Sequence, residues 1–261
     1  MLKPKKQLGQ NFLINEKIAD DIVAAAVLSR EDTVLEIGPG TGVLTERLSR
    51  AAGSVLAVEK DFDLIDKLRR RMGQKNLKLI HQDALWFDLS LLKDYKVVAN
   101  IPYNITSPLI RKFIENEPRP ELLIMMVQLE VAERITAKAG DSSRGLLTLI
   151  VEFYANAEIL FEVNRKEFFP IPGVDSAVIK IVPKTKLPDI EPALFFRVVK
   201  AGFSSKRQQI HNSLSGTLRL EKDVVLKLLS DSNIEIKRRA EDLTLEEWIC
   251  LAKEYSKIIE S

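Results

Sequence analysis

The sequence has few of the residues that mark secreted, metal-binding or membrane proteins. Its 261 residues include one cysteine, Cys250, which excludes an internal disulfide and fits a reducing compartment. The two histidines, His81 and His211, lie in segments of different kinds, so we expect no metal site. No stretch approaches the roughly 20 apolar residues that span a bilayer. The first lysines precede no apolar core of a signal peptide, so we expect a cytoplasmic protein without a membrane partner.

An excess of charge of one sign is also missing from the chain as a whole. Lysines and arginines number 39 against 37 acidic residues, and the net charge of +2 does not by itself indicate a nucleic-acid partner. The basic residues are unevenly placed, because residues 197–239 contain ten of them and only four acidic residues. This local excess predicts a surface for a phosphate backbone. Ordinary solvated helix faces are the alternative.

Apolar residues, in contrast, make up 46% of the chain, enough for a substantial core. From about residue 31 to 183, β-branched apolar runs alternate with amphipathic stretches, which predicts an α/β fold with a mostly parallel, seven-stranded sheet and crossover helices. The expected strands are Thr33–Ile37, Ser54–Glu59, Leu77–His81, Lys96–Ala99, Leu122–Gln128, Ala157–Val163 and Ala177–Val182. The expected helices are Glu16–Val27, Leu44–Arg50, Asp63–Met72, Ser107–Glu115 and Val131–Ala137.

The last part of the chain has a different pattern. Pro183, Pro188 and Pro192 mark a polar linker, and no strand pattern follows it. Four short helices are expected there, at Ala193–Gly202, Lys206–Ser213, Lys222–Ser230 and Leu245–Ile259. The sequence therefore predicts two domains, with the sheet in residues 1–185 and a small all-α domain in residues 186–261.

Three glycines, Gly38, Gly40 and Gly42, lie between the first expected strand and the next helix. Glycine allows positive φ and a close approach of the backbone to a ligand, and a helix N-terminus offers free N–H groups. A dinucleotide site would have G-x-G-x-x-G spacing, whereas here glycine occupies every second position and Val43 follows. The spacing resembles that of an S-adenosylmethionine loop. A nicotinamide oxidoreductase is the less favoured interpretation.

Polar residues end three of the expected strands. Glu59 can accept both hydroxyls of a ribose, and Asp83 can accept an adenine amine while Ala84 packs on the ring. Ligands of open α/β sheets bind beyond the carboxyl ends of the strands, so Glu59, Asp83 and Asn100 should converge on one crevice with the glycines. Each residue by itself would also suit an ordinary turn or cap.

The tetrapeptide Asn100-Ile101-Pro102-Tyr103 matches the Asn-x-Pro-aromatic motif of amino-methyltransferases. The side-chain oxygen of Asn100 and the carbonyl of Ile101 can hold both hydrogens of an adenine amine and aim its lone pair at a sulfonium methyl. Pro102 fixes φ and removes a donor, and Tyr103 offers a flat face to the base. We expect catalysis by positioning and electrostatics, without a metal. A plain β-turn is the alternative.

On these motifs the chain resembles the KsgA family of small-subunit ribosomal RNA adenine dimethyltransferases, over nearly its whole length. The resemblance implies a Rossmann-like class I methyltransferase domain that binds S-adenosyl-L-methionine. The segment 10–13 is similar to the family's N-terminal cofactor segment, which implies that Asn11 and Leu13 contact the methionine end. Gly38, Glu59, Asp83 and Asn100 match the remaining cofactor positions, and the loop glycine Gly40 and Ala84 complete the expected site.

Two further segments carry the resemblance. Residues 168–176 are similar to the family's Phe-x-Pro-Pro-Pro-Lys-Val-Asp-Ser segment, which implies that Phe168 is the second aromatic wall of the target-base pocket; a core aromatic is the alternative. Residues 203–214 are similar to the family's basic helix, in which Lys206, Arg207 and His211 would contact RNA. The sequence departs from the family pattern at Ile171, Gly173 and Gln208.

The resemblance implies dimethylation of N6 of two adjacent adenosines near the 3′ end of 16S rRNA during ribosome biogenesis. The partner would be an immature 30S particle, and we expect a monomer. Two alternatives remain. One is an Erm-type enzyme that modifies 23S rRNA and shares the loop and the tetrapeptide, although residues 130–138 and 206–214 are more like the KsgA family. The other is an RNA-binding assembly factor whose methylation is dispensable.

Overall fold

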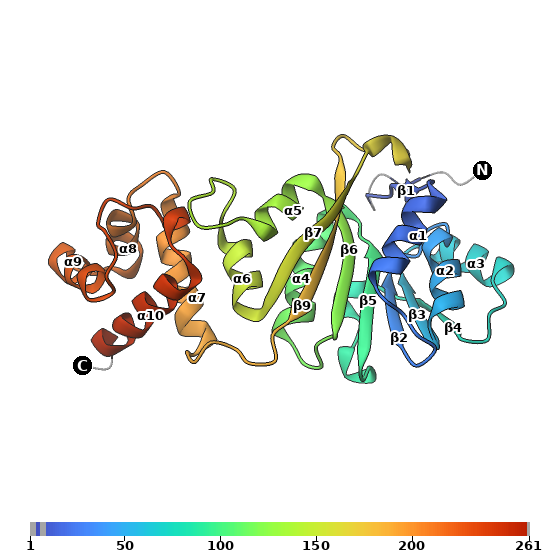
Figure 1. The fold of residues 1–261 in the computed structure, drawn as a ribbon, viewed down its shortest axis with the longest axis horizontal. Helices are drawn as coiled ribbons and strands as arrows, with labels where there is room; N and C mark the ends of the chain where they lie inside the picture. Colours follow the sequence, from blue (N-terminus) through green and yellow to red (C-terminus); the bar gives the residue numbers. More distant parts are fainter. Residues whose placement is uncertain (1–3, 6–8, 260–261) are drawn as a thin grey trace. The chain divides into compact units, whose positions relative to one another are not determined.

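The computed structural model describes residues 4–5 and 9–259, and Figure 1 shows its ribbon. Contacts divide the chain into two compact units, the first formed by residues 1–132 and 155–183 and the second by residues 133–154 and 184–261. The segment 133–154 thus groups with the C-terminal helices, which no sequence pattern indicated. The expected boundary between residues 185 and 186 stays a prediction about separately folding domains.

Unit 1 contains the expected seven-stranded sheet, with strand order β4-β3-β2-β5-β6-β9-β7. Its strands are β2 (Thr33–Ile37), β3 (Ser54–Glu59), β4 (Leu77–His81), β5 (Tyr95–Asn100), β6 (Leu122–Gln128), β7 (Ala155–Val163) and β9 (Ser176–Pro183). The strands from β4 to β6 pair in parallel, whereas β9 runs antiparallel to both β6 and β7. The prediction of a mostly parallel sheet is therefore confirmed.

The register of the parallel strands determines which residues meet at their carboxyl ends. Ile37 of β2 lies opposite Val58 of β3 and Ala99 of β5. The next residues along each strand, Gly38, Glu59 and Asn100, therefore leave the sheet at the same edge. This is the arrangement that the sequence predicted for the crevice.

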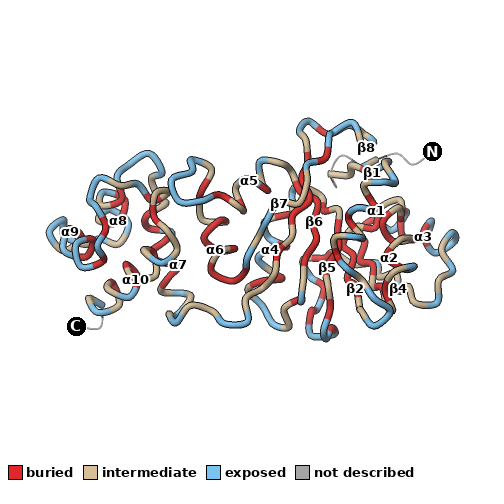
Figure 2. Tube along the Cα trace, in the orientation of Figure 1, coloured by how far each residue is buried: buried red, intermediate tan, exposed pale blue. Residues whose placement is uncertain are grey.

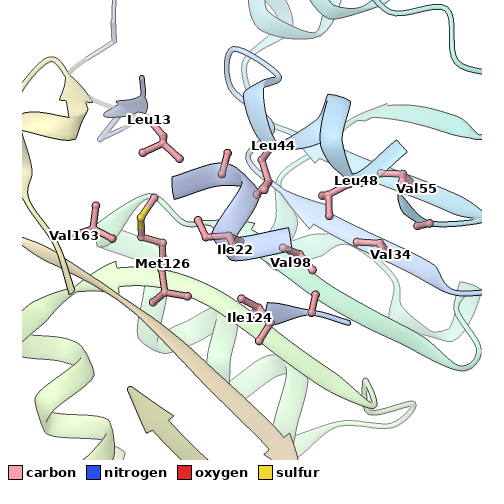
Figure 3. Packing of buried hydrophobic residues seen from close by; sticks show 14 of the residues in the cluster. Leu13, Ile22, Val34, Leu44, Leu48, Val55, Val98, Ile124, Met126 and Val163 are labelled. Carbon is pink, nitrogen blue, oxygen red and sulfur yellow. The ribbon is translucent and has the colours of Figure 1, made fainter. Parts of the chain in front are cut away.

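Helices and core residues cover both faces of this sheet. The helices of unit 1 are α1 (Glu16–Ala25), α2 (Val43–Ala51), α3 (Phe62–Arg71), α4 (Thr106–Glu115) and the start of α5 (Leu129–Thr136). Figure 3 shows Ile22 of α1 lying over the sheet near Val98, in the cluster that also contains Val34. The neighbours along these strands, Leu35 and Val97, point to the opposite face and are also fully buried. Figure 2 shows the resulting burial along β2, β5 and β6.

Unit 2 is helical, as predicted for the C-terminal part. It contains α6 (Leu146–Tyr154), α7 (Pro192–Gly202), α8 (Ile210–Leu218), α9 (Lys222–Asp231) and α10 (Leu245–Ile259). The start predicted for α8, at Lys206, is four residues too early, because residues 203–205 form a 3₁₀ turn and Gln208 donates its N–H to the Ser205 carbonyl at 2.9 Å. Within residues 4–5 and 9–259, no helix has the length and apolar character to cross a membrane.

Candidate active site

A cavity of about 150 Å³ lies at the carboxyl ends of the parallel strands in unit 1. The predicted site residues that line it are Asn11, Leu13, Gly38, Gly40, Glu59, Asp83, Ala84, Asn100, Ile101, Pro102 and Tyr103. The structure thus brings together the glycine loop, the strand-ending acids, the tetrapeptide and the N-terminal segment. Phe168 does not line this cavity, and Lys206, Arg207 and His211 belong to unit 2.

The glycine loop follows β2 and leads into α2. Gly38, Gly40 and Gly42 all have positive φ, between 56° and 83°. A β-carbon on Gly40 would lie 3.0 Å from the ring of Phe12, and one on Gly42 would lie 2.5 Å from the end of Met72. The backbone conformation favours glycine at all three positions, and at Gly40 the ring of Phe12 also leaves little room for a side chain.

Glu59 ends β3 as a buried carboxylate at the cavity. It accepts hydrogen bonds from the N–H groups of Gly40 at 3.3 Å and Asp61 at 2.9 Å. Burial raises the pKa of Glu59, whereas these two N–H groups act in the opposite direction. Each oxygen of a carboxylate has two acceptor sites, so Glu59 keeps capacity for further donors.

Asp83 lies two residues after the end of β4 and caps the start of the 3₁₀ turn Ala84–Trp86. It accepts from Lys60 Nζ at 2.8 Å and from the N–H of Leu85 at 3.0 Å. Burial acts to raise the pKa of Asp83, but these two hydrogen bonds outweigh it and hold the pKa below its usual value. Asp83 is therefore an anion at neutral pH.

The N-terminal segment lines the same cavity and is held there by strand pairing and hydrogen bonds. Phe12–Leu13 forms β1, which pairs antiparallel with β8 (Phe168–Phe169). Asn100 donates its amide to the carbonyl of Asn11 at 3.4 Å, and Gln10 donates to Asp61 at 2.8 Å. Lys5 also contacts Asp61, at 2.6 Å. Sequence reasoning missed Asp61, whose only signal is its place two residues after the strand-ending Glu59.

Glu36 is a second carboxyl group that sequence reasoning did not single out. It lies on β2 two residues before Gly38, is buried, and lines the cavity. Its Oε2 atom has no hydrogen-bond partner among the described residues. Burial raises the pKa of Glu36 to about 8; the nearby Thr45 hydroxyl opposes the rise, and the charge of Glu59 adds to it. An acidic residue in an otherwise apolar strand next to a glycine loop was the available signal.

The tetrapeptide leaves β5 at the cavity edge. The Asn100 amide nitrogen is committed to Asn11, so its Oδ1 is available as an acceptor. The Tyr103 hydroxyl lies 2.8 Å from Ser176 Oγ, which fixes the direction of the ring. Burial raises the pKa of Tyr103, with Ser176 opposing, so the side chain is a neutral phenol at ordinary pH.

Phe168 is placed differently from the role that the resemblance implied. Its side chain is 1% exposed and belongs to the hydrophobic cluster with Leu13 and Met126, whereas its neighbour Phe169 is 57% exposed. Successive residues of a strand point to opposite faces, and pairing with β1 turns Phe168 inward. This placement favours the alternative of a core aromatic, and stacking on the target base stays a prediction.

A family model described as ribosomal RNA adenine dimethylase matches residues 1–257. The chain belongs to the ribosomal RNA adenine dimethylase family. Two similar curated members are named ribosomal RNA small subunit methyltransferase A. The protein from Dehalococcoides mccartyi is 45% identical over 98% of this chain and 89% of its own, and the one from Nostoc sp. is 40% identical over 97% and 98%.

Solved structures also resemble this member of the dimethylase family. A dimethyladenosine transferase from Plasmodium falciparum has a TM-score of 0.83 and 30% identity, covering 94% of this chain and 98% of that one. The 23S rRNA methyltransferase ErmE has a TM-score of 0.75 and 28% identity, covering 94% and 100%. Family membership and these likenesses confirm the class I methyltransferase fold and the resemblance drawn from the sequence.

The RNA-contacting residues expected of a ribosomal RNA adenine dimethylase lie before and at the start of α8. Lys206 and Arg207 are exposed, and Lys206 Nζ contacts the carbonyl of Ser142. His211 is half-buried, with Nδ1 3.2 Å from the carbonyl of Ile236. Of the ten cations counted in this region, Arg238 is paired with Glu247, and Arg239 lies 3.9 Å from a carboxylate oxygen of Glu241. The sequence count therefore overstates the charge that is free to meet a phosphate backbone.

Proposed function

We propose that this protein transfers methyl groups from S-adenosyl-L-methionine to N6 of two adjacent adenosines near the 3′ end of small-subunit ribosomal RNA. The product would be N6,N6-dimethyladenosine, formed on an immature 30S particle in the cytoplasm during ribosome biogenesis. The observation that carries the proposal is the convergence of Asn100–Tyr103 with the glycine loop, Glu59 and Asp83 on one cavity. The names of the curated relatives support the small-subunit substrate.

The residues of the cavity fit S-adenosylmethionine, whose sulfonium and ammonium groups are cationic. Carboxyl groups of Glu36, Glu59 and Asp83 line the cavity, against the single ammonium of Lys60 among the lining residues. Oε2 of Glu36 is buried and lacks a partner among the described residues, which is costly unless a donor or cation reaches it. The Asp83 carboxylate, whose pKa is lowered, attracts a cation, whereas Glu36, with a pKa of about 8, is protonated at neutral pH and offers a hydrogen bond rather than a charge.

Named residues would hold each part of the cofactor. Glu59 keeps acceptor capacity for ribose hydroxyls, and Asp83 for the adenine amine, with Ala84 against the ring. Asn11 and Leu13 line the same cavity from the N-terminal segment, where Asn100 donates to the Asn11 carbonyl, and would meet the methionine end. When bound, the cofactor supplies an electrophilic methyl group on a good leaving group.

The tetrapeptide would position the adenine amine. Oδ1 of Asn100 and the carbonyl of Ile101 accept its two hydrogens, which directs the nitrogen lone pair toward the methyl. The ring of Tyr103, held by Ser176, stacks on the base and excludes water from one side. No strong base is needed in this scheme, because the amine proton can leave after the new bond forms.

The second unit would bind the RNA. Lys206 and Arg207 are exposed cations and suit phosphate contacts, and the half-buried His211 lies beside them at the start of α8. We further propose that the protein acts as a monomer with a catalytic domain, residues 1–185, and a helical RNA-binding domain, residues 186–261.

The deciding experiment offers S-adenosylmethionine with immature small subunits or with large-subunit RNA, and identifies the modified nucleoside by mass spectrometry. We expect N6,N6-dimethyladenosine in small-subunit RNA only. Modification of large-subunit RNA alone would favour an Erm-type enzyme instead. Binding to small subunits without any methyl transfer would favour an assembly factor.

A further inference from the structure

Lys112 makes an unusual set of contacts behind the cavity. It is half-buried on α4, and its ammonium donates to three carbonyl oxygens, those of Ala84 at 3.0 Å, Leu85 at 2.8 Å and Phe87 at 2.5 Å. All three acceptors belong to the short 3₁₀ turn Ala84–Trp86 and the residue that ends it. A lysine more than two dozen residues away in sequence therefore closes the end of this turn.

The chemistry of the contact matches donors to acceptors. An ammonium has three N–H donors and a neutral amine only two, so three carbonyl acceptors require the charged form. The Ala84 carbonyl also accepts from the N–H of Phe87 at 3.3 Å. Carbonyls at the end of a helical turn carry partial negative charge, which favours a cation at that end. Burial lowers the pKa of Lys112, whereas the nearby carboxylates of Asp88 and Asp83 oppose this effect.

The turn that Lys112 closes is the one that carries the expected adenine contacts. Asp83 caps its start by accepting from the N–H of Leu85, and Trp86 donates its N–H to the carbonyl of Asp83 at 3.0 Å. Asp83 and Ala84 line the cavity, but Lys112 does not. Lys112 therefore acts on this part of the cavity only through the turn.

Helix α4 connects the same lysine to the other half of the site. It begins at Thr106, after the single 3₁₀ turn 103–105 that follows the tetrapeptide. The helix also packs against the turn Ala84–Trp86. The hydrogen bonds of Lys112 therefore connect the expected adenine pocket to helix α4, which follows the tetrapeptide Asn100–Tyr103 in the chain.

We propose that Lys112 is a positioning residue that holds the turn at Asp83 and Ala84 in the conformation that receives the adenine of the cofactor. The inference rests on the proposed function for the identity of the ligand. The role of Lys112 in holding the turn is independent of that function, because its three hydrogen bonds to the turn are made within the protein itself. Lys112 itself touches neither the cofactor nor the target base in this scheme.

The test compares Lys112→Met, which removes the donors but keeps an unbranched side chain, with Lys112→Arg, which keeps the charge and several donors. Lys93→Met is the matched control, because Lys93 is exposed in the neighbouring segment. Amide hydrogen exchange of residues 83–92 reports on the turn without any cofactor. Calorimetric titration with S-adenosylhomocysteine and with adenosine reports on the pocket, and kinetics separate KM from kcat.

We expect faster exchange in residues 83–92 of Lys112→Met, partial restoration in Lys112→Arg, and no change in Lys93→Met. Affinity for S-adenosylhomocysteine and for adenosine should fall by the same factor, about tenfold for the loss of charged hydrogen bonds. KM for S-adenosylmethionine should rise while kcat changes little.

Unchanged exchange and unchanged affinity in a folded Lys112→Met protein would overturn the inference. So would a loss of affinity for S-adenosylhomocysteine without a matching loss for adenosine. If Lys112→Met does not fold, Lys112→Gln, which retains two donors, is held to the same criteria. Failure of the wild type to bind S-adenosylhomocysteine would contradict the proposed function, and the exchange data would still decide the role of Lys112 in the turn.

Discussion

The two halves of the cavity are built in different ways. The cofactor half depends on backbone, since the glycines adopt positive φ and the N–H of Gly40 bonds directly to Glu59. The target-base half depends on side chains from distant segments. Asn100 is fastened to Asn11, 89 residues away, and Tyr103 to Ser176, 73 residues away. A backbone-built site is specified by local sequence, whereas a side-chain site also needs the surrounding packing to be correct.

The largest effect should come from the target-base half. Asn100→Ala removes the acceptor for the adenine amine, and methyl transfer should fall by at least about 10²–10³-fold, as when one positioned polar group is removed from an active site. Binding of RNA should change little, because the expected RNA contacts belong to residues of unit 2. Single-turnover methyl transfer and calorimetry measure the two quantities. Substantial residual transfer in this variant would remove Asn100 from its assigned role.

The next largest effect distinguishes a core position of Phe168 from a position in the wall of the base pocket. If it is a core residue, Phe168→Ala should lower the free energy of unfolding by about 3–5 kcal/mol, the usual loss for a buried phenylalanine. The exposed neighbour gives a control, and Phe169→Ala should be close to neutral in stability. Chemical denaturation measures both. Phe168→Leu retains an apolar core, so a large rise in the KM for RNA in that variant at full stability would restore Phe168 as a wall of the base pocket.

In the cofactor half, the ionisation of Glu36 should make the stability of the protein depend on pH. The pKa of Glu36 is 4.5 when unperturbed and about 8 in the folded protein, so between these values the folded state holds a proton that the unfolded state has lost. The stabilising contribution is complete below pH 4.5 and is lost as the pH rises through 8, at up to about 1.4 kcal/mol per pH unit. Glu36→Gln cannot ionise and should lack this dependence.

Denaturation of the wild type and of Glu36→Gln from pH 5 to 9 measures the difference directly. The stability of the wild type relative to the variant should decrease as the pH rises. Glu31→Gln, at an exposed position of the same unit, is the control and should follow the wild type. Parallel curves for wild type and Glu36→Gln would show that Glu36 ionises normally in the fold.

The sequence predictions succeeded for elements that a local pattern specifies and failed for elements that depend on contacts with distant segments. The parallel strands were predicted to within one residue, because continuous β-branched runs suit a sheet buried on both faces. Helix α6 was missed. Its Thr148–Val151 and Phe153–Tyr154 are all buried, so it lacks the polar stripe by which an amphipathic helix is found. The two-residue strands β1 and β8 were also missed, since they exist only through pairing with each other.

The residues of the site were predictable where their role is local. Glu59 and the glycines follow strands at fixed offsets, and the tetrapeptide is contiguous. Asp61 and Lys112 act through bonds to residues far away in sequence, Lys5 and Ala84 respectively, and no local pattern indicates such a role. For Phe168 the sequence allowed both a base-stacking and a core position, and only the pairing of β8 with β1 turns it inward.

The smallest predicted effect tests whether the cofactor half is indeed backbone-built. Gly42→Ala places a β-carbon on a residue with φ of +83° and within 2.6 Å of Leu68. Left-handed backbone costs about 1–2 kcal/mol for a residue with a β-carbon, and the flexible ends of the neighbouring side chains can move aside. The free energy of unfolding should therefore fall by about that amount, and Kd for S-adenosylhomocysteine should rise. Gly73→Ala is the matched control, because nothing lies within 4 Å of its added carbon. Equal stability and affinity in the two variants would mean that side chains, not backbone, shape this half as well.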